Sequence, residues 1–240
     1  AVGSSTSLAI GADGFPVISY HDYTAYSLKV AKCNNAACTL TTITTVDDPP
    51  NSVGGYTSIA VGTDGFPVIS YYDNSAYSLK VAKCNDAACA GGGETITTVD
   101  DPPTLQRVGA YTSIAIGTDG FPVISYTDTD RGVLKVAKCN DPACAAGGET
   151  ITDVDNPVLY VGYHTSIVIG DDGFPVISYA ETNGENLRVA KCLDAACSLA
   201  TISVVDDSAD RAGDYTSIAI GNDGFPFIID DDSDHSALKV

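Results

Sequence analysis

GTDGFPVISYYD, at residues 62–73, is the stretch that decides the fold, because close copies of it occur five times in this chain of 240 residues. Its Asp-Gly pair recurs at steps of 51, 55, 53 and 51 residues. The aspartates of these pairs are Asp13, Asp64, Asp119, Asp172 and Asp223. Self-similarity at a long, nearly constant period is the signature of repeat architectures.

Each repeat contains the same four β-like segments. In the second repeat these segments are residues 57–62, 67–71, 79–83 and 95–100. Val, Ile, Thr and Tyr dominate them, and Gly, Asp, Asn and Pro separate them, as is typical of strands and turns. Asp64-Gly65 supplies the tight turn of a hairpin, and Pro67 begins the next strand, where a missing N–H does little harm. No helical periodicity of useful length occurs, so the chain is predicted to be all-β.

Four strands in each of five repeats predict a five-bladed β-propeller of four-stranded antiparallel blades. We expect a single domain over residues 1–240, with repeats at about 1–51, 52–106, 107–159, 160–210 and 211–240. The fifth repeat reaches Val240 within its third strand, so the last blade lacks its fourth strand within this chain. Either that blade has three strands, or the natural chain continues, or a partner supplies the strand by edge pairing. We favour continuation or a partner.

The eight cysteines form four pairs, each at the predicted tip between the third and fourth strands of a repeat. Four residues between two cysteines at a hairpin end favour disulfides within each repeat, as Cys33–Cys38, Cys84–Cys89, Cys139–Cys144 and Cys192–Cys197. Four metal sites are the alternative, but zinc usually needs four ligands and no histidine recurs near these pairs. Disulfides indicate an extracellular, cell-surface or periplasmic location.

Composition excludes some classes of partner. The net charge of −19, from 31 acidic and 12 basic residues, repels phosphate backbones and anionic lipid, so we expect no nucleic acid partner. No apolar run reaches the roughly 18 residues that a membrane-spanning helix needs, so we expect no membrane insertion. The first residue is Ala, which we interpret as the processed start of an exported chain.

The stretches TSIAVGTDGFPVISYYD (57–73) and LKVAK (79–83), with their copies, resemble a bacterial family of extracytoplasmic β-propeller repeats. The motif of that family is written SIA-x4-DG-x-P-x-ISYYD followed by LKVA. The resemblance covers nearly the whole chain and implies blade architecture, but it implies no activity, because members mostly lack an assigned function. This chain departs from the pattern in having no Trp, which the fourth strand often carries, and in adding the cysteine pair.

Variation between repeats concentrates in the loops between strands two and three and in the links from strand four to the next strand one. We expect both on one face, with strand one innermost. Tyr beside Asp or Asn is typical of sugar binding, and solvated turn residues are the alternative. The candidate ligand-binding residues are Tyr56, Tyr72, Asp73, Tyr111, Asp128, Tyr163, Glu181, Tyr215 and Asp232. Strand one begins with Thr-Ser in every copy. These residues either form a ring of hydroxyls that lines the axial channel or are simply small enough to fit a crowded axis.

The three histidines suggest a metal site. If the ring closes, the fourth, fifth and first blades are consecutive, and the histidines share one sector of this face. The candidate metal ligands are His21, Asp22, His164, Asp230, Asp231, Asp232, Asp234 and His235. A site of imidazole and carboxylate groups suits a transition metal, whereas acidic loops alone suit calcium. Calcium is the one cofactor that the sequence suggests.

Three classes of function remain. The favoured one is a binding or scaffold module, lectin-like, that recognises a glycan or a protein partner through this loop face. The second is a structural accessory subunit of a larger complex, with the missing strand supplied by that partner. The third is a glycosidase that uses axial carboxylates, namely Asp22, Asp73, Asp128, Glu181 and Asp232. Their equivalent positions argue against the unlike environments that an acid and a base require, so an enzyme is the least favoured class.

Overall fold

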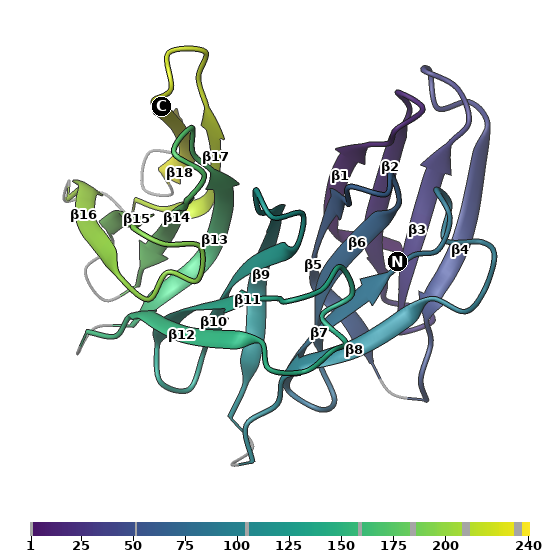
Figure 1. Cartoon of the computed structure of the whole chain (residues 1–240), viewed down its shortest axis with the longest axis horizontal. Helices are drawn as coiled ribbons and strands as arrows, with labels where there is room; N and C mark the ends of the chain where they lie inside the picture. The colour runs from purple at the N-terminus through teal and green to yellow at the C-terminus, as the bar shows by residue number, and fades with distance from the viewer. Residues whose placement is uncertain are drawn as a thin grey trace.

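The computed structural model describes residues 2–50, 52–103, 106–157, 160–182, 186–207, 212–232 and 237–240. Within these residues every regular element is a β-strand, and the strands form five antiparallel sheets of four, four, four, four and three strands. The sheets are arranged around a common axis as the blades of a propeller (Figure 1). The predicted five-bladed, all-β architecture is confirmed.

Each blade consists of consecutive strands that meander outward from the axis. Blade one contains β1 (Val2–Ile10), β2 (Pro16–Asp22), β3 (Ser27–Cys33) and β4 (Thr41–Asp47). Blade two contains β5 (Val53–Val61), β6 (Pro67–Asp73), β7 (Ser78–Lys83) and β8 (Thr95–Asp100). Blade three contains β9 (Val108–Ile116), β10 (Pro122–Asp128), β11 (Val133–Lys138) and β12 (Thr150–Asp155). Blade four contains β13 (Val161–Ile169), β14 (Pro175–Glu181), β15 (Asn186–Cys192) and β16 (Ala200–Asp206). Blade five contains β17 (Asp214–Ile220), β18 (Pro226–Asp232) and β19 (Ala237–Lys239), so it lacks a fourth strand as predicted.

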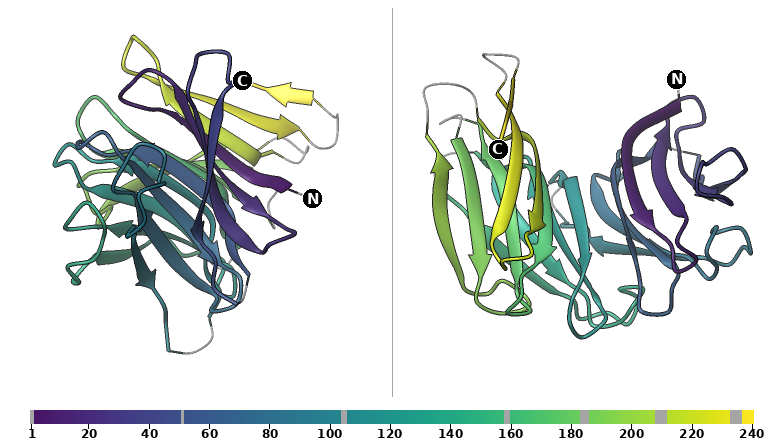
Figure 2. Two further views of the ribbon diagram at one scale, coloured as in Figure 1. Left: turned by 90° about the vertical axis from the view of Figure 1, so that its right-hand side faces the viewer. Right: turned by 90° about the horizontal axis from the view of Figure 1, so that it is seen from above.

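The ring is open between blade five and blade one. The inner strands β1, β5, β9, β13 and β17 follow one another around the axis, each packed on the next. Figures 1 and 2 show the last blade, in yellow, separated from the first, in purple. Grouping the histidines in one sector assumed a closed ring, and that assumption is wrong for the described residues.

The Thr-Ser pair of each inner strand joins neighbouring blades. Thr112 Oγ1 donates to Ser70 Oγ of blade two at 2.8 Å, and both side chains are buried. Two residues further on, the N–H of Ile114 donates to Ser58 Oγ at 3.2 Å. The same two contacts recur at the other three blade interfaces, except that Thr165 donates to the Tyr111 carbonyl and accepts from Ser125. The recurrence of Thr-Ser therefore has a packing cause wherever two blades meet, because the threonine bonds the preceding blade and the serine bonds the following one.

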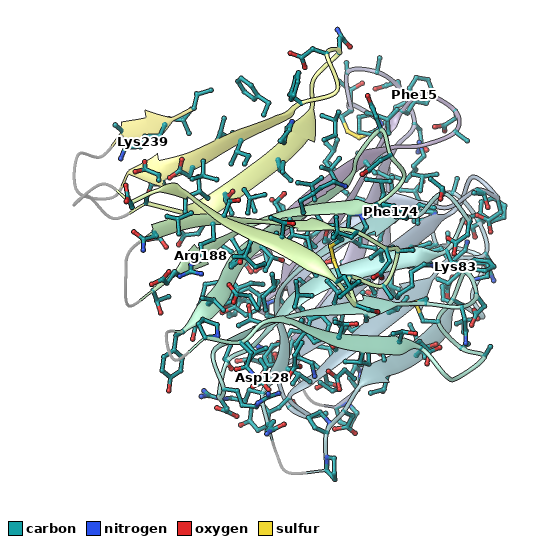
Figure 3. The ribbon with its side chains drawn as sticks, turned by 60° about the vertical axis from the view of Figure 1, so that its left-hand side comes forward. Phe15, Lys83, Asp128, Phe174, Arg188 and Lys239 are labelled. Atoms are coloured by element: carbon teal, nitrogen blue, oxygen red, sulfur yellow. A yellow bond between two sulfur atoms is a disulfide. The ribbon has the colours of Figure 1, made fainter. Side chains whose placement is uncertain are left out.

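A buried ion pair at the outer strand adds a second joint. Asp100, the last residue of β8, accepts hydrogen bonds from the Tyr126 hydroxyl at 2.6 Å and from Lys135 Nζ at 2.7 Å, both in blade three. Asp47 receives the same two donors from blade two, and Asp155 receives a tyrosine and Arg188 from blade four (Figure 3). Buried charges need such pairing, so strand four of one blade is fixed to strands two and three of the next.

The predicted disulfides are present. All four cysteine pairs are bonded within their own blade, with Cα–Cα distances of 4.8 to 4.9 Å, and no cysteine is free. Four disulfides indicate that the protein matures in an oxidising environment. The described residues contain no helix that is long and apolar enough to span a membrane.

The hydroxyl joint is tested by Thr112→Val, which keeps the side-chain shape and leaves the buried Ser70 hydroxyl without its donor. We expect the free energy of unfolding in urea to fall by about 1–3 kcal/mol. Thr6→Val is the matched control, because Thr6 occupies the same position in blade one and is exposed, having no preceding blade. Its effect should stay within about 0.5 kcal/mol. Equal losses in both variants would contradict this role of the hydroxyl.

Candidate binding site: an aromatic arc on the axis

A β-bulge in the inner strands turns one side chain per blade toward the axis. In β5 the pairing with β6 shifts register between Gly55 and Ser58, and Tyr56 within this bulge has a φ of 51°. Tyr111, His164 and Tyr215 have the same conformation, with φ of 54°, 51° and 50°. Bulges commonly re-aim side chains near functional sites. A non-glycine residue in this conformation costs on the order of 1 kcal/mol or more, so the fold keeps these residues there against a local preference.

The four rings form a continuous arc across blades two to five. Ring centroids lie 4.4 Å apart between Tyr56 and Tyr111, 4.6 Å between Tyr111 and His164, and 4.4 Å between His164 and Tyr215. We call these four residues the aromatic arc. The fourth repeat contributes His164, and Tyr163 precedes that position by one residue. The prediction that Tyr163 matches the other three tyrosines is therefore wrong in position, and His164, expected among metal ligands, takes that place. Alignment on the Thr-Ser pair carries the signal that separates them.

The arc borders an open axial pocket of about 500 Å³. Its other lining residues are Ser5, which occupies the arc position in blade one, and the five threonines of the inner strands, Thr6, Thr57, Thr112, Thr165 and Thr216. No charged side chain is among the described residues that line it. The pocket therefore offers aromatic faces and hydroxyl groups, a surface suited to an uncharged polar ligand.

A second pocket of about 320 Å³ adjoins the first between blades two and three and shares Tyr56 and Tyr111 with it. Its remaining lining residues are Tyr72, Asn74, Arg107, Ala110, Thr129 and Tyr163. Arg107 is neutralised by Asp130, which accepts from Nε at 2.8 Å and from Nη2 at 2.6 Å. Burial raises the pKa of Tyr72 to about 12, so its hydroxyl remains a hydrogen-bond donor at neutral pH. Asn74, Arg107 and Thr129 were not predicted as site residues. The sequence marks Arg107 only as the single basic residue in the connection between the fourth strand of blade two and the first strand of blade three.

His164 is held neutral within the arc. Burial lowers the pKa of His164, and the carboxylate of Asp214, 3.6 Å from Nε2, opposes this effect only in part. At pH 7 the ring is therefore an uncharged aromatic surface beside Tyr111 and Tyr215. It resembles its tyrosine neighbours in shape and charge.

The predicted carboxylates Asp22, Asp73, Asp128 and Glu181 are not among the lining residues of either pocket. Asp73 accepts from the N–H groups of Ser75 and Ala76 at 3.0 and 2.9 Å, which fixes the turn after β6. Asp22, Asp128 and Glu181 are also buried, and each pairs with a basic side chain of its own blade, as Asp73 does with Lys80. A ligand-binding role for these residues stays a prediction, and the Asp232 side chain lies outside the described residues.

The predicted metal ligands do not converge in the described part of the chain, where no group of three or more His, Cys, Asp or Glu residues is placed to hold an ion. His21 is buried against the Tyr23 ring, with 4.5 Å between centroids, and burial lowers its pKa. Asp230 accepts from the N–H of Gly213 at 2.9 Å, and Asp231 lies in the pairing of β18 with β19. Asp234 and His235 lie outside the described residues. The calcium and transition-metal hypotheses stay untested predictions.

No protein-family model matches the chain, and no curated protein matches it in sequence, so the family resemblance of the repeat motif stays a prediction. Solved structures do share the fold. A protein of unknown function from Dyadobacter fermentans has a TM-score of 0.68 at 11% identity, covering 95% of this chain and 74% of that one. The GH93 α-L-arabinofuranosidase of Fusarium graminearum, solved with arabinobiose, has a TM-score of 0.63 at 12% sequence identity. The match covers 99% of this chain and 80% of that one. An exo-β-1,3-galactanase from Phanerochaete chrysosporium has a TM-score of 0.61 at 11% sequence identity, and the match covers 95% of this chain and 56% of that one. These likenesses establish the propeller fold alone.

The internal role of Asp22 can be tested by titration. Lys29 Nζ, at 2.6 Å, and the N–H groups of Thr24 and Ala25 bind its carboxylate and lower the pKa of Asp22 to about 2. Because the pKa of Asp22 is lower in the folded protein, its ionised carboxylate stabilises the fold at pH values above the ordinary pKa of about 3.9. That stabilisation disappears as the pH falls toward about 2. NMR should find the Asp22 carboxyl titrating near 2, and the stability difference from Asp22→Asn should shrink between about pH 5 and pH 2. A titration near 4 would show that these contacts do not form in solution.

Proposed function

We propose that this protein is a lectin-like binding module that holds a neutral oligosaccharide on the aromatic arc. The observation that carries the proposal is the arc itself, four rings from four successive blades facing one axial pocket. Carbohydrate rings present C–H faces that stack on aromatic side chains and hydroxyl groups that need hydrogen-bond partners. The arc supplies the first, and the tyrosine hydroxyls of the arc, with those of the exposed Ser5 and Thr6, supply the second.

Charge favours a neutral ligand. No charged side chain is described in the lining of the axial pocket, and the single cation of the adjoining pocket, Arg107, is paired with Asp130. The chain as a whole carries a net charge of −19. An anionic glycan would approach against this field without a free cation to receive it.

The adjoining pocket favours a ligand of more than one sugar. Tyr56 and Tyr111 border both pockets, so a chain of sugars stacked on the arc reaches Asn74 and Tyr72 without leaving an aromatic surface. The Asn74 amide offers both a donor and an acceptor for sugar hydroxyls. The four disulfides support a location outside the cytoplasm, where such glycans occur.

Binding without hydrolysis is the function that the described residues favour. Glycosidases usually need two carboxylates on either side of the scissile bond, about 5 to 10 Å apart. No Asp or Glu is described in the lining of either pocket, and the carboxylates of the second strands are buried in turns and ion pairs. The activities of the arabinofuranosidase and the galactanase therefore guide only the choice of test sugars.

The test is binding of neutral arabino- and galacto-oligosaccharides, first on a glycan array and then by calorimetry. We expect Tyr111→Ala to weaken binding at least about tenfold, because Tyr111 borders both pockets and lies between Tyr56 and His164 in the arc. The matched control is Tyr77→Ala. Tyr77 is an exposed tyrosine in the same left-handed conformation, with a φ of 62°, and it lines neither pocket.

Each alternative result has a meaning. Equal losses in the two variants would place the ligand elsewhere on the protein. Failure of the native protein to bind any neutral glycan would contradict the proposal. Release of sugars from the panel by the native protein would replace it with a glycosidase function.

A further inference from the structure

Blade one presents to solvent the face that every later blade buries. Leu8 is 56% exposed, whereas Ile59 at the same position of blade two is 6% exposed, and Ile114, Ile167 and Ile218 are similarly buried. Cys38 is exposed, whereas its counterparts in blades two to four are buried. The difference follows from position, because blades two to five each pack this face on a preceding blade.

The uncovered face is shaped to receive a blade. Gly109 needs to be glycine because a Cβ there would lie 2.7 Å from Leu79 Cα of the preceding blade. Gly3 holds the same place in blade one, with a φ of +84°, and nothing lies within 4 Å of its Cβ position. Its positive φ already favours glycine, and the empty space at its Cβ position leaves room for a leucine of another blade to pack as Leu79 does at Gly109.

The donors of the ion-pair joint are also in place. Tyr20 corresponds to the buried Tyr71, Tyr126 and Tyr179, whose hydroxyls bind the strand-four aspartate of the preceding blade. Tyr20 is only half-buried. Lys29 corresponds to Lys80 and Lys135, and it binds Asp22 of its own blade instead. Blade one thus carries both donors of the joint without the carboxylate from another blade.

Blade five shows the complementary face. Phe227 is 57% exposed, whereas Val17 at the same position of blade one is fully buried by blade two. Leu238 and Val240 are exposed, and their counterparts in blades one to three are fully buried. Among the described strands β19 pairs with β18 alone, whereas the third strand of every other blade also pairs with a fourth strand. Figure 3 shows Lys239 on this outer strand, and the right-hand view of Figure 2 shows both faces bordering the same opening.

We propose that this opening is a docking site for one further blade of the same repeat, led by a fourth strand that pairs with β19. The four internal interfaces specify its chemistry. Toward blade one it presents a strand-three leucine against Gly3 and a strand-four aspartate to Tyr20 and Lys29. Toward blade five it presents a glycine against Leu238 and an inner-strand N–H to the Ser217 hydroxyl, whereas Ile229 stands where the earlier blades offer a serine to the threonine. Such strand addition is a known mode of recognition at exposed sheet edges.

A second copy of this chain does not satisfy the same faces. Blade one of one copy against blade five of another is a head-to-tail contact that generates open filaments unless its rotation closes a ring. It also leaves the β19 edge unpaired. Two chains that each carry a net charge of −19 repel one another as well.

The experiment adds a polypeptide of residues 41–100 to the intact chain. This probe carries the sequence of β4 followed by that of blade two, so it offers a fourth strand and then a whole blade. We expect a one-to-one complex in native mass spectrometry and a higher Tm. Leu8→Lys and Phe227→Lys are surface changes in the chain alone and should leave its Tm nearly unchanged, but each should weaken the complex at least about tenfold. Asp100→Ala in the probe should weaken it too, because it removes the carboxylate meant for Tyr20 and Lys29.

A second measurement tests the proposal even if the free probe does not fold. The same segment is joined to Val240 through a flexible linker, and the Tm is compared with and without Leu8→Lys. A gain in Tm that Leu8→Lys removes supports the proposal. Absence of both the complex and the gain overturns it, as does self-association of the chain that Leu8→Lys abolishes. None of these outcomes depends on glycan binding, so this proposal and the proposed function fail separately.

Discussion

The contact between one blade and the next is the constraint on which the rest of the structure depends. A carboxylate at the end of strand four receives a tyrosine hydroxyl and a basic side chain from the following blade. An inner-strand threonine bonds a serine in the second strand of the preceding blade, and an inner-strand N–H bonds a serine in the inner strand of that blade. No blade has a core of its own, because the buried clusters combine residues of adjacent blades, such as Val17 and Leu28 with Ile59 and Tyr71. Repetition of the sequence is thus repetition of one interface.

Because residues beside the bulge make the blade contacts, the side chain within the bulge is free to face the axial pocket. Thr57 and Ser58 are used in blade contacts, while Tyr56, one residue earlier, is turned by the bulge into the axial pocket. The same bulge recurs with tyrosine or histidine in three further blades, so the arc arises from a strained backbone position that the blade contacts hold in place. Binding and stability therefore reside in neighbouring residues with different tasks.

The period and the Asp-Gly turns were sufficient to predict the blades and the strand order, and the spacing of the cysteines predicted the disulfides, since each depends on local sequence. The site was harder to predict. Tyr56, Tyr111 and Tyr215 were identified, but the role of His164 depends on the bulge, which alternation of apolar residues does not reveal. The acidic residues after the second strands looked like ligands, whereas turn N–H groups and basic side chains occupy them. The opening was not predicted either, because equivalent repeats look alike whether or not a neighbour covers them.

Hydrogen exchange of the intact chain tests most directly the claim that contact with a preceding blade stabilises each inner strand. The N–H groups of Ile59, Ile114, Ile167 and Ile218 donate to a serine of the preceding blade, whereas Leu8, at the same position, has no preceding blade. We expect the four isoleucine amides to exchange slowly, close to the rate of global unfolding, and the Leu8 amide to exchange far faster. Equal protection at all five positions would contradict the claim, because it would show that each blade is stabilised without its neighbour.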